Sequence, residues 1–121
     1  MLFRSDAAWY NRGIALDSLG RYEEVIPSFN RAIDIRLDRD EAWSNRGIIL
    51  VNLGKYEEAI TSFDRAIEIK PEQSKVWNNR GNALYQLGRY EEAITSFDRA
   101  IEIKPEQSKV WNNREIGRAH V

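Results

Sequence analysis

The chain contains no cysteine and a single histidine. The absence of cysteine excludes disulfides, thiolate metal sites and cysteine nucleophiles, and it fits any redox compartment. His120 stands beside the C-terminus without a second histidine at metal-ligand spacing, so we interpret it as a tail residue and not as a ligand or a base. The residue types that most often carry metal or nucleophilic chemistry are therefore almost missing.

An excess of charge and long apolar runs are missing as well. The 121 residues include 18 basic and 19 acidic side chains, which gives a net charge of −1. Such a chain lacks the basic field that phosphate neutralisation requires, so nucleic acid is not an expected partner. No apolar run approaches the length of a membrane span, and the opening MLFRSDAAWY lacks the apolar stretch of a secretion signal. We expect one soluble domain over residues 1–121, with the cytoplasm as the default location and no membrane partner.

Catalytic motifs are not found either. The chain has no G-x-S-x-G and no Gly-Lys-Ser/Thr sequence. The acidic pairs Glu57-Glu58 and Glu91-Glu92 fall in the first turn of expected helices, where negative charge offsets the positive helix end. The sequence therefore predicts no enzyme, no catalytic residue, no cofactor and no metal site.

What the sequence does have is a period of 34 residues, set by four tryptophans. These are Trp9, Trp43, Trp77 and Trp111. Six further columns recur at this spacing, and in the second unit they are Gly47, Leu50, Gly54, Tyr56, Phe63 and Ala66. The segment 56–80 recurs unchanged as 90–114, which indicates a recent duplication within a longer array.

Each unit predicts two helices that cannot bury their apolar faces alone. The first, around 43–53, places its apolar residues three or four apart and ends at Gly54, which suits the left-handed position after a helix. Gly47 and Ala59 are expected to be small where the two helices of a unit cross, and Trp43 and Phe63 to fill the remaining space. The second helix, around 56–70, ends before Pro71, because proline excludes helical geometry from the preceding residue.

The pattern W-x3-G-x2-L, then LG-x-Y-x2-A, F-x2-A and P, resembles the tetratricopeptide repeat family over about residues 6–114. The resemblance implies an all-α solenoid, a right-handed superhelix of antiparallel helix-turn-helix units with about seven helices. The repeats are predicted at 6–39, 40–73 and 74–107, followed by a half repeat or capping helix at 108–121. Glu115 stands where a packing glycine is due and would clash with a partner helix, but we expect no second helix after this one in the chain.

Repeat one departs from the pattern at two positions. Leu37 replaces the terminating proline, so Asp38 or Asp40 is expected to cap the following helix. Pro27 falls inside the second helix, where it removes one backbone hydrogen bond and predicts a modest kink.

An arginine precedes the packing glycine in every unit, at Arg12, Arg46, Arg80 and Arg114. We favour a packed stem with an outward guanidinium, for which Asp64 and Asp98 are candidate partners, over a ligand contact.

One face of each first helix, opposite the tryptophan, varies far more than the core columns. The resemblance implies that this face lines a concave groove that binds peptides. The candidate residues are Tyr10, Asn11, Ile14, Asn45, Ile48, Asn52, Lys75, Asn78, Asn79, Asn82 and Tyr85. Asparagine can both donate to and accept from a peptide backbone, and the apolar neighbours can form side-chain pockets. The alternative is that these positions are solvated filler.

The leading functional hypothesis is a scaffold that binds a peptide or protein segment in this groove. Chaperone-binding relatives clamp a C-terminal carboxylate, but only Asn45 and Lys75 match that clamp, whereas Tyr10, Ile14 and Asn79 do not. One alternative is a self-associating structural repeat unit, with weak homo-oligomers formed through apolar array ends such as Trp111. A further alternative is a fragment of a larger TPR-containing regulatory protein.

Overall fold

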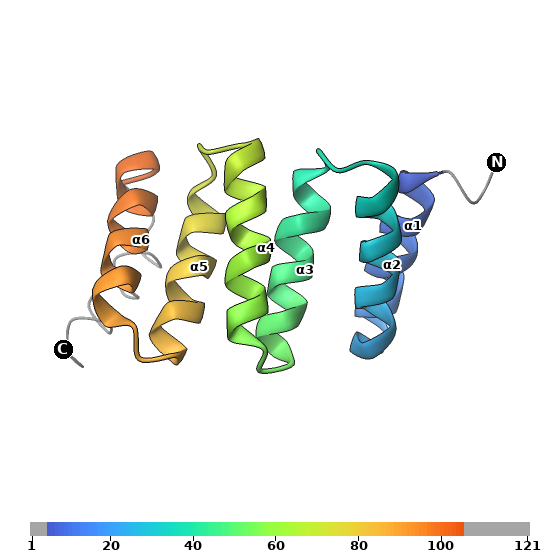
Figure 1. Ribbon diagram of the computed structural model, residues 1–121, viewed down its shortest axis with the longest axis horizontal. Coiled ribbons are helices and arrows are strands. Elements are labelled where there is room, and N and C mark those ends of the chain that lie inside the picture. Colours follow the sequence, from blue (N-terminus) through green and yellow to red (C-terminus); the bar gives the residue numbers. More distant parts are fainter. Residues whose placement is uncertain (1–4, 106–121) are drawn as a thin grey trace.

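A computed structural model describes residues 5–105, and within this range the chain forms six α-helices and no strand (Figure 1). The helices are α1 (Asp6–Ser18), α2 (Tyr22–Ile35), α3 (Asp40–Asn52), α4 (Tyr56–Ile69), α5 (Ser74–Gln86) and α6 (Tyr90–Ile103). The all-α solenoid is confirmed. The seventh helix, expected from Ser108 and including Trp111, lies outside the described residues.

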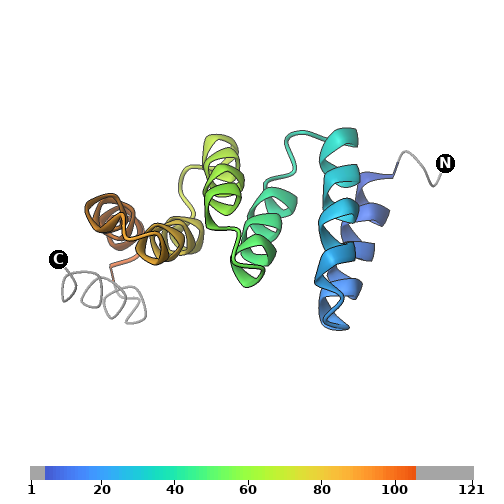
Figure 2. The ribbon, with the colours of Figure 1, turned by 60° about the horizontal axis from the view of Figure 1, so that its bottom comes forward.

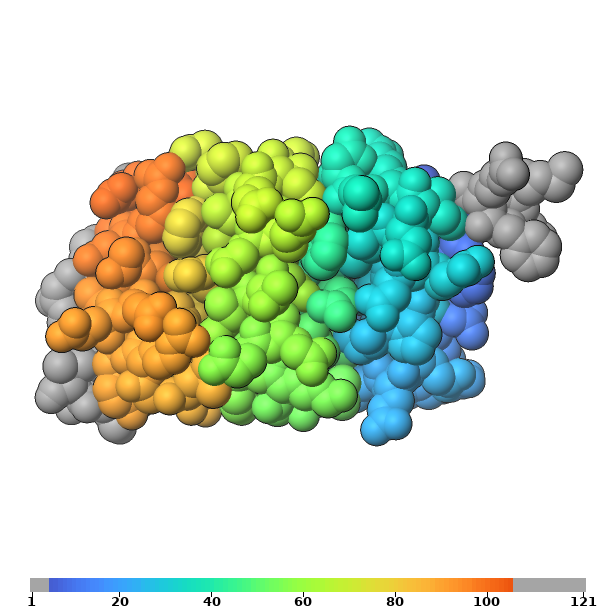
Figure 3. Space-filling view, in the orientation of Figure 1, coloured from blue at the N-terminus to red at the C-terminus, as the bar shows by residue number. Residues whose placement is uncertain are grey.

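The helices form two rows. Each pairs with its neighbours in sequence, and α3 also contacts α5, which does not follow it directly. Turning the molecule shows α3 and α5 along one side, with α4 and α6 along the other (Figure 2). In the space-filling view the side chains of successive helices meet in one continuous surface (Figure 3). Residues of the first helices in successive repeats are therefore brought next to one another.

The turn within each repeat follows from its glycine. Gly54 has a φ of +76°, in the left-handed region that residues with a Cβ adopt at a cost. This conformation lets the amide of Lys55 donate to the carbonyl of Leu50 at 2.8 Å, and the amide of Gly54 to that of Val51 at 2.9 Å. These two bonds satisfy carbonyls that the helix end would otherwise leave without partners. The predicted helix stop is confirmed.

A contact between Gly47 and Phe63 sets the crossing of the two helices of repeat two. A Cβ added to Gly47 would lie 2.5 Å from the Phe63 ring, closer than real Cβ contacts. Phe63 and Ala59 are fully buried, as the small-residue pattern predicts. Both Trp43 and Phe63 are expected from the sequence to fill the interior. This is correct for Phe63, whereas Trp43 is only partly buried.

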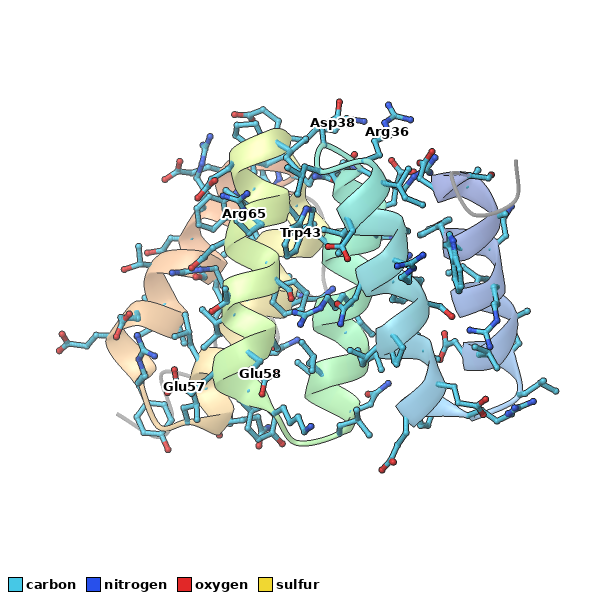
Figure 4. All side chains as sticks on the ribbon, turned by 45° about the vertical axis from the view of Figure 1, so that its right-hand side comes forward. Arg36, Asp38, Trp43, Glu57, Glu58 and Arg65 are labelled. Carbon is cyan, nitrogen blue, oxygen red and sulfur yellow. The ribbon has the colours of Figure 1, made fainter. Side chains whose placement is uncertain are left out.

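The tryptophan instead secures the linker between repeats. Trp43 Nε1 donates to the carbonyl oxygen of Leu37 at 2.9 Å, and Trp77 Nε1 donates to that of Pro71 at the same distance. Arg65 places its guanidinium 5.5 Å from the centre of the Trp43 ring, and the two side chains lie together in Figure 4. Loss of the proline at Leu37 leaves the linker in register, because α2 ends at Ile35 as α4 ends at Ile69, one repeat later.

The expected aspartate cap of α3 is wrong. The cap position is occupied by Arg39, whose side chain makes no capping bond. Asp38 accepts from Arg36 Nε at 2.9 Å, and both lie at the same end of the molecule in Figure 4. Asp40 is already the first residue of the helix, where its buried carboxylate lies 3.7 Å from Lys70 Nζ. Both carboxylates therefore have other partners. The acidic residues Glu57 and Glu58 do stand in the first turn of α4, as expected (Figure 4).

The arginine column joins neighbouring repeats. Arg80 Nη1 donates to Ser96 Oγ in its own repeat at 2.6 Å, and Arg80 Nε pairs with Asp64 of the preceding repeat at 2.6 Å. The predicted Arg80–Asp64 pair is confirmed. Arg46 repeats this arrangement with Ser62 at 2.6 Å, but its Nε meets the neutral oxygen of Asn30 at 2.8 Å.

Gly47→Ala should lower the free energy of unfolding by about 1–3 kcal/mol, because the new methyl group collides with Phe63. The direction of this change tests the contact, because replacing glycine by alanine in a helix interior with free space would raise the free energy of unfolding by about 1 kcal/mol. Chemical denaturation measures the change. The double variant Gly47→Ala/Phe63→Leu serves as the control and should recover part of the loss. A more stable single variant would show that the contact does not limit the crossing.

Asn30→Asp should stabilise the junction of repeats one and two by less than about 1 kcal/mol, because it gives Arg46 the carboxylate that Arg80 already has. Burial lowers the pKa of the Arg46 guanidinium, so an anionic partner offsets its desolvation. Thermal unfolding at low and high salt measures the effect, which salt should reduce. Asp64→Asn is the matched reversal and should destabilise; equal stability of all three proteins would contradict the prediction.

Candidate interaction groove

The first helices of the three repeats, α1, α3 and α5, share one face of the molecule. At its α1 end the side chain of Tyr10 fills the space between α1 and α3. Its ring stacks on Phe29 with centroids 5.7 Å apart, and its hydroxyl accepts from Asn45 Nδ2 at 2.7 Å. The guanidinium of Arg39 lies 5.3 Å from the centre of the same ring. Two predicted groove residues, Tyr10 and Asn45, are thus brought together, and they bind each other across α1 and α3.

The environment of Tyr10 favours its neutral form. Burial is the main cause that raises the pKa of the Tyr10 hydroxyl above its ordinary value of 10.0, and the negative charge of Glu41 adds to it. The bond from Asn45 acts in the opposite direction and is the smaller effect. The closed end of the face is therefore an uncharged hydrogen-bonded pair at neutral pH.

Between α3 and α5 the same face opens into a cavity of about 170 Å³. It is lined by Ile48, Val51, Asn52, Phe63, Asn79 and Asn82. Four of these are predicted groove residues, contributed by both helices. Phe63 is a lining residue that sequence reasoning misses, because its column is occupied by phenylalanine in every repeat and is explained by core packing. All six lining residues are uncharged.

A difference in sequence between repeats distinguishes the closed part of this face from the open part. The position of Tyr10 is occupied by Ser44 in repeat two, 34 residues later. Tyr10 contacts Phe29 and Asn45, and the equivalents of those two residues are Phe63 and Asn79, which line the cavity. The Ser44 hydroxyl instead donates to the carbonyl of Glu41 at 3.2 Å. Where the tyrosine ring is missing, space remains.

The other predicted residues are not gathered at the cavity. Asn78 is buried, with 6% of its surface exposed, so the expectation that it lies on an open face is corrected. Tyr85 is partly buried against the core and lies 5.3 Å from Tyr90, measured between ring centroids. Lys75 lines a separate hollow with Glu72, Gln73, Ser74 and Lys104. Asn11 and Ile14 are exposed on α1.

Within residues 5–105, no cluster of three His, Asp or Glu side chains is placed to hold a metal ion. In the same range, no helix combines the length and apolar character that a membrane crossing requires.

These features define a class of protein, a helical-repeat solenoid with an exposed, partly hollow face along its first helices. Models of the tetratricopeptide repeat match the chain over residues 44–108 and 7–37. The chain therefore belongs to the tetratricopeptide repeat family. No curated protein sequence matches it closely enough to count as a relative.

Solved structures with the same architecture include three that span most of the chain. The first TPR of Spaghetti (RPAP3), bound to the HSP90 peptide SRMEEVD, has a TM-score of 0.92 at 20% identity and covers 97% of this chain and 93% of its own. The Arabidopsis OM64 TPR domain also has a TM-score of 0.92 at 20% identity, with full coverage of both chains (100%). MamA has a TM-score of 0.83 at 25% identity and covers 88% of this chain and 63% of its own.

Tyr10→Phe should remove part of the loss of stability at alkaline pH. The folded state raises the pKa of Tyr10, so above about pH 10 the unfolded chain releases a proton that the folded chain retains, and the free energy of unfolding falls. Denaturation at pH 8 and above about pH 10 compares the two proteins. At pH 8 the variant should lose about 0.5–1.5 kcal/mol with the Asn45 bond, and its further loss at alkaline pH should be smaller than that of the wild type. Equal alkaline losses would contradict the assignment.

Proposed function

We propose that this protein is a scaffold that binds a peptide or protein segment along the face of its first helices. The observation that supports this most strongly is the cavity between α3 and α5, where Ile48, Asn52, Asn79 and Asn82 meet. The members of this group are up to 34 residues apart in the sequence, and each belongs to the variable face that the sequence predicts for the first helices.

The lining suits a peptide chemically. The amides of Asn79 and Asn82 offer both donors and acceptors to a peptide backbone, and Ile48 and Val51 offer apolar contact to its side chains. Ile48 is 37% exposed, so a bound segment would remove part of this apolar surface from water. An amphipathic wall of this kind is a better match to a polypeptide than to a highly charged ligand.

A solved structure of the same fold supports a peptide partner. The first TPR of Spaghetti holds a peptide, and its architecture covers nearly the whole of this chain. By analogy we infer a protein or peptide partner here. At 20% identity the analogy does not extend to the particular peptide.

Self-association is a second candidate, and an exposed face of repeat one favours it. Leu53 packs against the buried cluster of repeat one, and Leu87 packs against that of the next two repeats. Their equivalent, Leu19, is 68% exposed, next to Tyr22 at 36%. Sedimentation over a range of concentrations tests this function, and Leu19→Glu should abolish any association that uses this face.

The double variant Asn79→Ala/Asn82→Ala should lose partners that the wild-type protein captures, because it removes the amides that would hold the backbone of a bound segment. The measurement is retention of proteins from cells of the source organism on immobilised wild type and variant, analysed by mass spectrometry. Thermal unfolding should shift little, since neither asparagine is fully buried.

The matched control is Thr61→Ala/Glu68→Ala, which removes two exposed side chains from the second helix α4. It should retain the same partners as the wild type. If the asparagine variant retains every partner, or if both variants lose them equally, binding does not use the face of the first helices.

A further inference from the structure

We propose that the cavity between α3 and α5 is a subsite for one apolar side chain of an extended, uncharged peptide segment, and that Ser44 keeps it open. This inference rests on the proposed function and specifies the ligand of the same face. It assigns selectivity for an apolar side chain to the junction of repeats two and three. The junction of repeats one and two, which Tyr10 closes, does not have this selectivity.

The size of the cavity supports a single side chain. Its volume of about 170 Å³ is below the range of about 300–1,000 Å³ that is usual for small-molecule pockets. A leucine-sized group attached to a backbone that passes across the opening fits this space better than a free metabolite does. The cavity is open to solvent at the surface of α3 and α5, so a chain can cross it without the helices separating.

The walls select an apolar group. The side chains of Ile48 and Val51 line the cavity with carbon atoms, and Phe63 borders it although its side chain has no solvent-exposed surface. A charged group placed against these side chains would lose hydration without a compensating partner. Asn52, Asn79 and Asn82 complete the lining with amides that can bond the backbone on either side of the inserted group.

The lining of the cavity includes no cation, and three cations that could hold an acidic ligand lie elsewhere. Arg46 bonds Asn30 and Ser62, and Arg80 bonds Asp64 and Ser96. Lys75 contributes to the separate hollow that also contains Glu72 and Lys104. An acidic peptide such as SRMEEVD, which the Spaghetti domain binds, would therefore meet no charge partner in the cavity.

A tyrosine at position 44 tests the proposal, because the equivalent position of repeat one already carries Tyr10. A tyrosine there would stand in the same relation to Phe63 and Asn79 as Tyr10 does to Phe29 and Asn45. Ser44→Tyr should therefore fill the cavity without disturbing the helices. Ser44→Ala is the matched control, because it removes the hydroxyl and leaves the space.

The test uses blocked peptides of sequence acetyl-Gly-Ser-Gly-X-Gly-Ser-Gly-amide, with X as Leu, Asn or Glu, and the free peptide SRMEEVD. Dissociation constants come from titrations that follow the side-chain amide signals of Asn79 and Asn82 by nuclear magnetic resonance. The Leu peptide should bind at least about tenfold more tightly than the Asn and Glu peptides, as burial of one leucine side chain supports. Ser44→Tyr should weaken the Leu peptide by a similar factor, and Ser44→Ala should not.

Ile48→Ala provides a second variant that keeps the cavity open and removes part of its apolar wall. It should also weaken the Leu peptide, so the test does not depend on the folding of Ser44→Tyr. Equal binding of the Leu and Glu peptides, or undiminished binding to Ser44→Tyr with a wild-type unfolding transition, would overturn the subsite. If SRMEEVD perturbs Asn79 and Asn82 while the Leu peptide does not, this inference fails and the proposed scaffold function stands. If none of the four peptides perturbs the face, the inference fails, and the partner-capture experiment decides the proposed function independently.

Discussion

The close contact between a glycine and a phenylalanine is the constraint on which the repeat depends. Gly47 meets the ring of Phe63 at a distance that leaves no room for a Cβ. This contact brings the two helices of a unit together and buries the ring completely. Because the same glycine–phenylalanine contact recurs in each described repeat, the two helices pack against each other in the same way in all three. Close packing transmits small changes in volume, so a side chain at the glycine position affects the whole unit.

The connections between repeats depend on polar groups as much as on apolar ones. Trp43 and Trp77 bond the carbonyl of the linker that precedes their helices. Arg46 and Arg80 bond a buried serine within their own repeat and an oxygen of the preceding repeat. The bonds to Ser62 and Ser96 satisfy two fully buried hydroxyls, which would otherwise lose their hydrogen bonds to water without a replacement. Stacking is thus specified by bonds with defined geometry, and not by apolar area alone.

The candidate site arises where this regular framework allows variation. The position occupied by Tyr10 in repeat one is Ser44 in repeat two and the buried Asn78 in repeat three. The tyrosine closes one junction of the first helices, and a cavity lies at the next one, where the serine stands. A conserved packing arrangement can therefore present a different surface at each junction without a change of fold, which is the property that a binding scaffold requires.

The sequence by itself determined the period, the helix pairs, the glycine turns and the family, because these follow from local conformational preferences and from spacing along one helix. It also predicted that the variable residues share one face. Only the tertiary structure decided which of them meet: Tyr10 with Asn45, and Ile48 with Asn79 and Asn82. It also showed that Trp43 bonds the linker before its helix and that the buried Phe63 borders the cavity. The physical reason is that the contacts across this face join residues of different helices, 35 residues apart for Tyr10 and Asn45. Their outcome depends on helix crossing and on the volume of a single side chain, neither of which the repeat period encodes.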